Sequence, residues 1–166
     1  MFAPHPTLLV DVDGVLSLFG FDQHDPPAGF PVLVDGIPHW LSSEAGGHLA
    51  RLARTFRCVW CSGWEERAEE HLPRLLGLPG GWEHLAFRSD SAADRHWKLA
   101  AIDAHAGSDA PVAWIDDAHD DTCRSWARER AGATLLVTTN PAVGLTAGHV
   151  AELEAWASFV HAGSER

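Results

Sequence analysis

The chain has 166 residues, 46% of them hydrophobic and 21% charged, a size and composition typical of one globular domain with its own buried core. Its 23 acidic and 12 basic residues give a formal net charge of −11, which disfavours binding to long nucleic acids unless a local basic patch exists. We find no membrane-spanning run and no basic leader in the sequence. We therefore expect a single cytoplasmic domain over residues 1–166 with no membrane partner.

The first predicted strand ends in two carboxylates. Residues 7–10 form an apolar run long enough for a strand buried on both faces, and Asp11 and Asp13 follow it, with a chain reversal at Gly14. Two carboxylates this close repel each other unless a cation or a shared proton lies between them. The pattern therefore predicts a hard metal ion such as Mg²⁺, or one raised pKa. The alternative is an acidic turn after a buried strand.

A hairpin is predicted after this strand. The segment that follows is rich in Gly, Pro and Asp, which predicts a loop, and residues 30–41 then form two short strands around Asp35-Gly36. Asp-Gly is a favoured pair for a tight type I′ turn. Because the hairpin emerges just after the two carboxylates, we expect it to lie over them as a flap. A helix should follow, with Ser42 or Ser43 as its cap.

A second buried strand is predicted over residues 57–61. Cys58 and Cys61 have the spacing of a metal or redox pair, but residues three apart on a strand face opposite sides. We therefore expect both to be core thiols in a reducing compartment. Ser62 and Gly63 follow immediately and precede a helix, which is the arrangement of an anion site at a helix N-terminus. The alternative is that Ser62 is only a helix cap.

A short third strand is predicted near residues 85–88, followed by a helix over about 96–106. This helix carries Lys98, the only lysine in a chain with 11 arginines. A lysine is a compact point charge, so one placed near a helix start is a candidate for binding an anionic group. The alternative is a lysine on a solvent-exposed face.

The fourth predicted strand, residues 112–115, ends in Asp116 and Asp117, a position equivalent to that of the first acidic pair. Asp120 and Asp121 follow, where acidic residues suit the start of the next helix. A fifth strand over residues 134–138 and a final amphipathic helix over about 147–160 complete the chain.

Five strands, most of them separated by helices, predict an α/β fold with a doubly wound, three-layer, Rossmann-like parallel sheet. Ligands bind at the carboxyl ends of the strands in such sheets. If the first, second and fourth strands are neighbours, their ends and the lysine form one site for a metal-bound phosphate. The candidate residues are Asp11, Asp13, Ser62, Lys98, Asp116 and Asp117.

These motifs, in this order and spacing, resemble those of the haloacid dehalogenase-like (HAD) phosphohydrolase superfamily. Its first motif, Asp-x-Asp-Gly after a strand, matches residues 11–14, and its second, a Ser or Thr that ends the next strand, matches Ser62. The third, a Lys before the fourth strand, matches Lys98, and the fourth, an acidic pair, matches Asp116-Asp117.

The resemblance implies a role for each residue. Asp11 would be the nucleophile that forms an aspartyl-phosphate, and Asp13 would be the general acid and base. Phosphoryl oxygens would bind to Ser62, the Gly63 amide and Lys98. Mg²⁺ would be held by oxygen atoms from the first and fourth motifs, namely the Asp11 carboxylate, the Asp13 main-chain carbonyl and Asp117, with Asp116 or Asp121 acting through water.

The resemblance also implies the strand order 3-2-1-4-5. The segments between the motifs are too short for a large cap domain, so we expect the flap alone to cover the site. Residues 60–65 and 76–79 further resemble a bacterial subgroup related to the HAD domains of multi-domain RNA-repair proteins.

We therefore predict a Mg²⁺-dependent phosphomonoesterase that acts on a small phosphorylated metabolite or nucleotide. Asp13 favours phosphoryl transfer, since the dehalogenases of the superfamily lack this second Asp. The first alternative is a polynucleotide end phosphatase, which the open site favours and the net charge opposes. The second is a non-catalytic domain that binds phosphate or a partner. The presence of Asp13 opposes this alternative, because a domain without turnover has no need of that residue. The sequence does not predict the oligomeric state.

Aromatic and histidine side chains are candidates for contacts to the rest of the substrate. Trp40 on the flap and Trp64 beside Ser62 could stack on a base or sugar, although tryptophan is more often a core residue. The histidines that could line the cleft are His24, His39 and His119.

Overall fold

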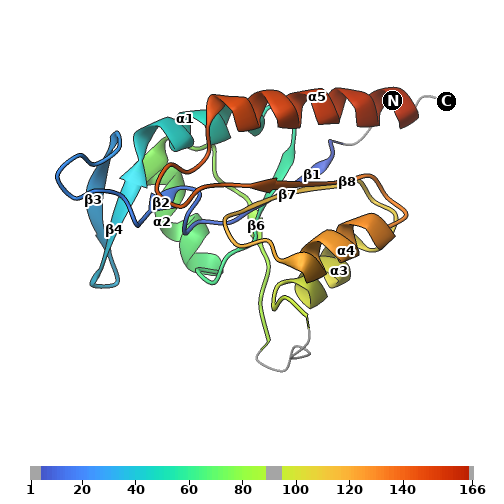
Figure 1. The fold of residues 1–166 in the computed structure, drawn as a ribbon, viewed down its shortest axis with the longest axis horizontal. Helices are drawn as coiled ribbons and strands as arrows, with labels where there is room; N and C mark the ends of the chain where they lie inside the picture. Colours follow the sequence, from blue (N-terminus) through green and yellow to red (C-terminus); the bar gives the residue numbers. More distant parts are fainter. Residues whose placement is uncertain (1–4, 89–94, 165–166) are drawn as a thin grey trace.

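In a computed structural model, which describes residues 5–88 and 95–164, five parallel strands form the central sheet (Figure 1). Their order is β6-β5-β1-β7-β8, which confirms the predicted order 3-2-1-4-5. The strands are β1 (Thr7–Val10), β5 (Arg57–Trp60), β6 (Glu83–His84), β7 (Val112–Asp116) and β8 (Thr134–Thr138).

Helices cover both faces of this sheet, giving the predicted three layers (Figure 1). Three helices pack on one face, namely α1 (Ser43–Leu52), α2 (Glu66–Leu76) and α5 (Ala147–Ser164). Two pack on the other, namely α3 (Leu99–Ala106) and α4 (Asp121–Glu129). In the part of the chain that the structure describes, no helix is long and apolar enough to cross a bilayer. Residues 1–4, part of the segment in which we predicted no leader, lie outside the described residues.

The alternation of side chains along the strands separates the core into two clusters. Leu8 and Val10 of β1 point to the face covered by α1, α2 and α5, and Leu9 points to the face covered by α3 and α4. Cys58 and Cys61 divide in the same way, and both are buried free thiols. The two thiols thus lie in the core on opposite faces of the sheet, as expected for residues three apart on a strand.

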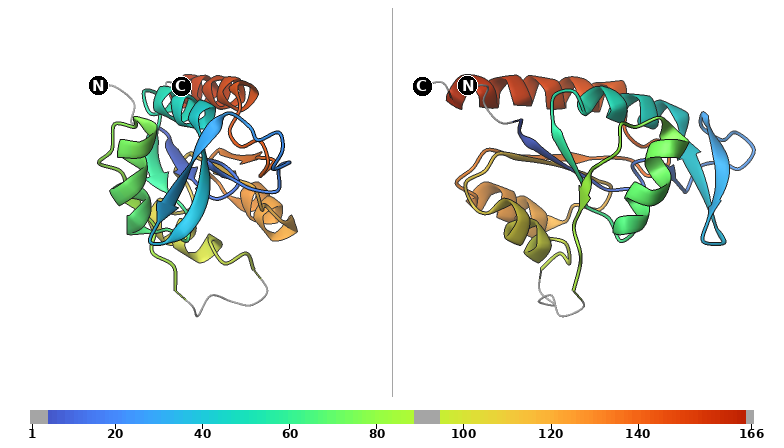
Figure 2. Two further views of the ribbon diagram at one scale, coloured as in Figure 1. Left: turned by 90° about the vertical axis from the view of Figure 1, so that its left-hand side faces the viewer. Right: turned by 180° about the vertical axis from the view of Figure 1, so that it is seen from behind.

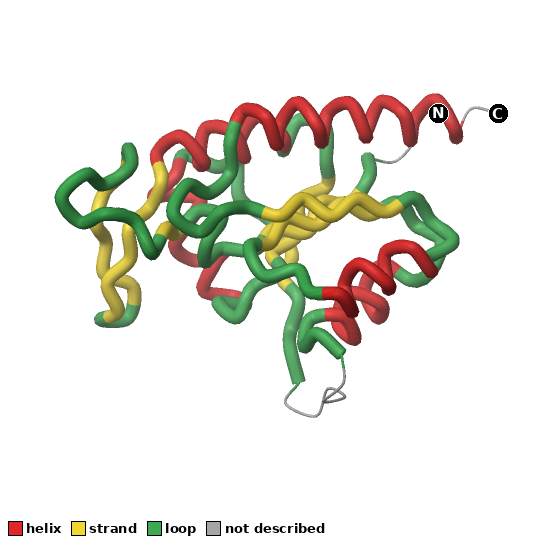
Figure 3. The backbone as a smooth tube through the Cα atoms, in the orientation of Figure 1, coloured by secondary structure: helices red, strands yellow, loops and turns green. Residues whose placement is uncertain are grey.

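The flap forms as predicted, with one additional strand. The hairpin strands are β3 (Gly29–Val34) and β4 (Ile37–Ser42), and the short strand β2 (Ser17–Leu18) pairs with β4 to give a three-stranded sheet. Asp35 and Gly36 both have positive φ, as a type I′ turn requires. The hairpin projects past one end of the central sheet (Figure 2), and loops fill the space between them (Figure 3).

Two predicted boundaries were wrong by a few residues. The third strand comprises Glu83 and His84, whereas the sequence predicts residues 85–88. After this strand, Leu85 N still donates a hydrogen bond of 2.9 Å to Trp60 O of β5. The helix predicted from residue 96 begins at Leu99. The ends of short strands and helices depend on their tertiary partners, and local residue patterns do not show which partners these are.

Candidate active site

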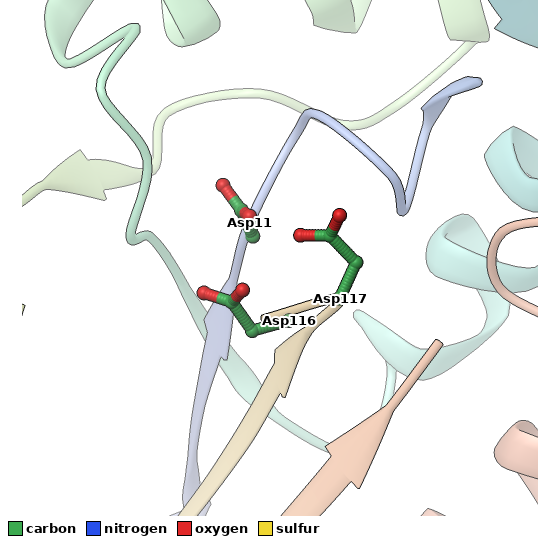
Figure 4. Close-up of side chains that lie close together, drawn as sticks. All are labelled: Asp11, Asp116 and Asp117. Atoms are coloured by element: carbon green, nitrogen blue, oxygen red, sulfur yellow. The ribbon is translucent and has the colours of Figure 1, made fainter. Parts of the chain in front are cut away.

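The two acidic motifs meet because β1 and β7 are adjacent and in register. Val10 pairs with Ile115, and Asp11 N donates a hydrogen bond of 3.0 Å to Ile115 O. The next residue of each strand is therefore an aspartate, and Asp11 and Asp116 lie side by side at the carboxyl ends of the strands (Figure 4). Asp11 is 6% exposed and Asp116 is 1% exposed. A parallel sheet thus places two buried carboxylates at the edge where ligands bind.

Lys98 lies between these two carboxylates. Its Nζ is 3.1 Å from Asp11 Oδ1 and 2.6 Å from Asp116 Oδ2, and the lysine side chain is 3% exposed. Lys98 is the residue directly before α3, and the ammonium reaches the strand ends from there. A buried ammonium is stable only when paired, so the three groups form one electrostatic unit.

Burial and the neighbouring charges alter the pKa values of this unit. Burial raises the pKa of Asp11 to about 7, although the charge of Lys98 opposes this. Burial also works to raise the pKa of Asp116, but Lys98 outweighs it and holds that pKa below its usual value. For Lys98, burial works to lower the pKa, but Asp11 and Asp116 outweigh it and raise that pKa. Lys98 is therefore positively charged. Its charge outweighs the effect of burial on the pKa of Asp116 but not on the pKa of Asp11.

Asp117 completes a cluster that fits a divalent metal ion. Asp11, Asp116 and Asp117 can each direct one carboxylate oxygen so that all three oxygens lie within 4.8 Å of one another (Figure 4). Burial and the charge of Asp116 raise the pKa of Asp117. Three carboxylates against one ammonium leave negative charge uncompensated, and oxygen ligands are those that Mg²⁺ prefers. The donor set therefore fits a hard cation.

Gly14 makes room for Asp117. Its φ is +75°, and a Cβ at this position would lie 2.4 Å from Asp117 Cγ and 2.6 Å from Asp117 Cβ. The loop after β1 thus passes so close to Asp117 that only glycine fits, and the backbone conformation independently favours glycine.

We expect Gly14→Ala to lower the affinity of the carboxylate cluster for a divalent metal ion by about 10- to 100-fold, because the new methyl group displaces the Asp117 carboxylate. It should also reduce the free energy of unfolding by about 1–2 kcal/mol, because alanine is strained at positive φ. The matched control is Gly20→Ala, since Gly20 has φ +76° with nothing within 4 Å of a Cβ. Calorimetric titration with Mg²⁺ checks the prediction, and equal affinities for the two variants would contradict it.

The side chain of Asp13 lies outside the carboxylate cluster and is 53% exposed. Trp64 Nε1 donates a hydrogen bond of 3.1 Å to Asp13 Oδ2, and His39 Nδ1 of the flap lies 3.9 Å from Asp13 Oδ1. The rings of His39 and Trp64 are tilted against each other, with their centroids 4.6 Å apart. His39 also contacts Ser17 Oγ at 3.0 Å. The flap and the loop after β5 therefore hold the carboxylate predicted to exchange protons.

A pocket of about 230 Å³ connects these groups. Gly63 lines it, whereas Ser62 is 1% exposed and its Oγ accepts a hydrogen bond of 3.2 Å from Trp64 N. The helix after Ser62 begins at Glu66, with Glu65 before it, so Ser62 caps the turn that leads into the helix and not the helix itself. The sequence-predicted residues that line the pocket are Asp11, Asp13, Gly63, Lys98, Asp116 and Asp117.

Other predicted residues lie elsewhere or have other partners. Asp121 has a side chain that is 97% exposed and pairs with Arg124, so Asp116 and not Asp121 joins the cluster. Trp40 donates from Nε1 to Pro27 O within the flap region. His119 is 8% exposed and contacts Thr138 Oγ1 through Nδ1, and burial lowers its pKa to about 4.

Sequence reasoning missed three residues of the pocket, His96, Trp97 and Ala118. Trp97 is 45% exposed, whereas Trp64, which we had considered for stacking, is 6% exposed. The local hydrophobic pattern does not distinguish these two tryptophans. The one available signal was that Trp97 directly precedes Lys98.

One comparison with known proteins finds a match. A family model described as "HAD domain in Swiss Army Knife RNA repair proteins" matches residues 7–150. This range contains both acidic motifs, Ser62 and Lys98. No curated protein matches the chain.

Proposed function

The chain belongs to the family of HAD domains in Swiss Army Knife RNA repair proteins, and from this premise we propose that its pocket hydrolyses phosphate monoesters. The observation that carries the proposal is the unit formed by Asp11, Lys98 and Asp116 at the base of the pocket, with Lys98 Nζ 3.1 Å from Asp11 Oδ1. A carboxylate beside a buried ammonium suits a nucleophile whose target carries negative charge. Asp13 at the same pocket supplies a group for proton transfer.

In the first half of the proposed reaction, a carboxylate oxygen of Asp11 attacks phosphorus and the bond from phosphorus to the leaving oxygen breaks. Protonated Asp13 donates its proton to that oxygen, and an alcohol departs. In the second half, Asp13 takes a proton from water, and the resulting hydroxide oxygen attacks phosphorus. The bond to Asp11 then breaks, which releases phosphate and restores both side chains.

Lys98 and Gly63 stabilise the phosphoryl group in both halves. The Lys98 ammonium is positioned to attract phosphoryl oxygens while it pairs with Asp11 and Asp116. Gly63 lines the same pocket from the loop after β5, and its amide is the backbone donor that we assign to the phosphoryl oxygens. A divalent cation held by Asp11, Asp116 and Asp117 would offset the repulsion between the anionic nucleophile and the anionic substrate.

Asp13 needs a defined orientation for proton transfer, because a general acid must lie within hydrogen-bond reach of the leaving oxygen. The indole N–H of Trp64 binds Oδ2 at 3.1 Å, which leaves Oδ1 on the side of His39. The flap that carries His39 is itself tied to α2 by an ion pair of 3.1 Å between Arg67 and Asp35. The flap thus contacts the site through His39 beside Asp13.

Removal of divalent metal ions tests the proposal directly. We expect wild-type protein to release phosphate from p-nitrophenyl phosphate in the presence of Mg²⁺, to lose this activity in excess EDTA, and to regain it when Mg²⁺ is restored. Release at an unchanged rate in EDTA would contradict the metal dependence, and no release from any monoester would contradict the phosphatase.

The cluster also predicts which acidic residue controls the metal dependence. Asp117→Asn should raise the Mg²⁺ concentration needed for half-maximal rate by about 10- to 100-fold, because the cluster loses one charged oxygen ligand. Asp121→Asn is the matched control from the same acidic stretch, and its effect should be within twofold, since this exposed side chain pairs only with Arg124.

A polynucleotide end phosphatase is the second candidate, and the family match is the observation that favours it. Two groups of arginines could form a basic patch for RNA, Arg51, Arg54 and Arg57 or Arg124, Arg128 and Arg130, and three of these six pair with carboxylates. Arg51 binds Glu154 at 2.7 Å, Arg57 binds Glu83, and Arg124 binds Asp121 at 2.9 Å. With a net charge of −11, we therefore place small phosphate monoesters first. RNA affinity that falls steeply with salt would reverse this order, and no RNA binding at low salt would exclude the second candidate.

A further inference from the structure

We propose that Trp97 forms a stacking subsite for an aromatic ring in the leaving group of the substrate, with nucleoside monophosphates as the fitting class. The inference rests on the proposed phosphatase function and specifies its substrate. All eight tryptophans lie among the described residues, and Trp97 is the most exposed of them, at 45%. Burial of so large an apolar surface favours folding, so an exposed indole beside a pocket is available for a ligand.

The indole of Trp97 lies beside both groups that are positioned to hold the phosphoryl group. Lys98 Nζ is 5.1 Å from the centroid of the Trp97 ring. A Cβ built at Gly63 would lie 3.8 Å from Trp97 Cη2. All three residues line the same pocket. A phosphoryl group bound between Lys98 and Gly63 therefore has the indole next to it, within reach of a ring in the leaving group.

Neighbouring rings hold the indole in place. Phe87 packs edge-on against it with the ring centroids 4.7 Å apart, and His96 stacks at 6.1 Å. His96 is in turn fixed by a hydrogen bond of 3.3 Å from Lys98 N to its Nδ1. An aromatic surface that is already ordered loses little conformational entropy when a flat ligand ring binds to it.

The other tryptophans near the site cannot take this role. Trp64 is 6% exposed, and its N–H is used by Asp13. Trp40 is half-buried, packs against Phe21 and donates its N–H to Pro27 O. These contacts account for both residues as structural parts of the flap and the loop after β5, whereas the contacts of Trp97 leave much of its ring open.

The test compares monoesters that differ in the leaving group: adenosine 5′-monophosphate, adenosine 3′-monophosphate, phenyl phosphate and ribose 5-phosphate. Trp97→Ala should lower kcat/KM for the aromatic substrates by about 5- to 150-fold, the range found for stacking of one base. The value for ribose 5-phosphate should change less than twofold, and Trp97→Phe should recover most of the loss. An effect on phenyl phosphate would place the ring directly beside the phosphoryl group, and an effect on the adenosine substrates alone would place a base there.

The matched control is Phe159→Ala, which removes an aromatic side chain that is 73% exposed on α5. It should leave all four values unchanged. A ratio of aromatic to aliphatic kcat/KM that is the same for wild type and Trp97→Ala would overturn the subsite while leaving the phosphatase intact.

A binding measurement keeps the two proposals separate if turnover fails. In Asp11→Asn protein, calorimetry should show adenosine 5′-monophosphate binding more tightly than ribose 5-phosphate, and Trp97→Ala in this background should remove the difference. Equal binding of the two ligands to the Asp11→Asn protein would overturn the stacking subsite whatever the outcome of the activity assay.

Discussion

Replacing Asp11 with asparagine is expected to lower the rate of phosphate release by about 10⁴-fold or more, because the amide cannot act as the nucleophile. Phosphate release from p-nitrophenyl phosphate at saturating Mg²⁺ measures the effect. Beryllofluoride, which mimics a phosphoryl group on a carboxylate, should bind to wild-type protein and not to the variant. Activity within tenfold of wild type would exclude Asp11 as the nucleophile.

The same substitution should leave the metal-free protein folded, and more stable at alkaline pH. The pKa of Asp11 is raised in the folded protein to about 7 from 3.8, so ionisation of this buried group opposes folding. This cost is absent below the unfolded pKa, grows as pH rises between the two values, and is complete above about 7. Asn cannot ionise, so it removes a cost of about 4 kcal/mol at most.

Thermal unfolding in EDTA checks this sign. The difference in Tm between Asp11→Asn and wild type should be positive at pH 8 and should shrink as pH falls to 5. Comparing the two proteins at each pH cancels contributions from other groups, such as His119, whose pKa burial lowers to about 4. A difference that grows on acidification would show that Lys98 stabilises ionised Asp11 more strongly than burial opposes it.

Replacing Lys98 with methionine is expected to damage both stability and activity. The side chain is 3% exposed, and its ammonium lies 3.1 Å from Asp11 and 2.6 Å from Asp116. Its removal leaves two buried carboxylates without their cationic partner, which should cost about 3–5 kcal/mol. For a chain of this length that corresponds to a decrease in Tm of about 6–20 °C. The rate should fall by about 10²- to 10³-fold or more, because the phosphoryl group loses its charged ligand.

The pH dependence identifies the cause of the lost stability. Lys98 holds the pKa of Asp116 below its usual value against the effect of burial, so without the ammonium that pKa rises above 3.8. The destabilisation of Lys98→Met should then be largest at neutral pH and should decrease as pH falls through the raised pKa. A loss that is constant with pH would indicate a packing defect instead.

A double variant provides the matched control for Lys98. Adding Asp116→Asn to Lys98→Met removes one of the two stranded charges, so part of the lost Tm should return while activity stays low. Lys98→Arg keeps the charge but not the compact shape, and it should be more stable than Lys98→Met. If the double variant were less stable than Lys98→Met, the two residues would not interact as the geometry indicates.

Local patterns were sufficient for most elements of the fold. The run of apolar residues before Asp11, the Asp35-Gly36 turn and the carboxylates that end β7 each depend on residues adjacent in the chain. The prediction of β8 as residues 134–138 agrees with the structure for the same reason. The third strand was misplaced because β6 has only two residues, both exposed, and its limits depend on its pairing with β5.

The sequence by itself determined the order of the strands and helices, the placement of two acidic pairs at strand ends, and the single lysine between them. Only the tertiary structure decided which of these groups meet. Sheet register placed Asp11 beside Asp116, and packing left Asp121 in solvent and exposed Trp97 while it buried Trp64 against Asp13. The physical reason is the separation along the chain over which each effect acts. Residue preferences and periodicity act over a few neighbours, whereas the site joins side chains that are separated by tens of residues and brought together by packing across the whole sheet.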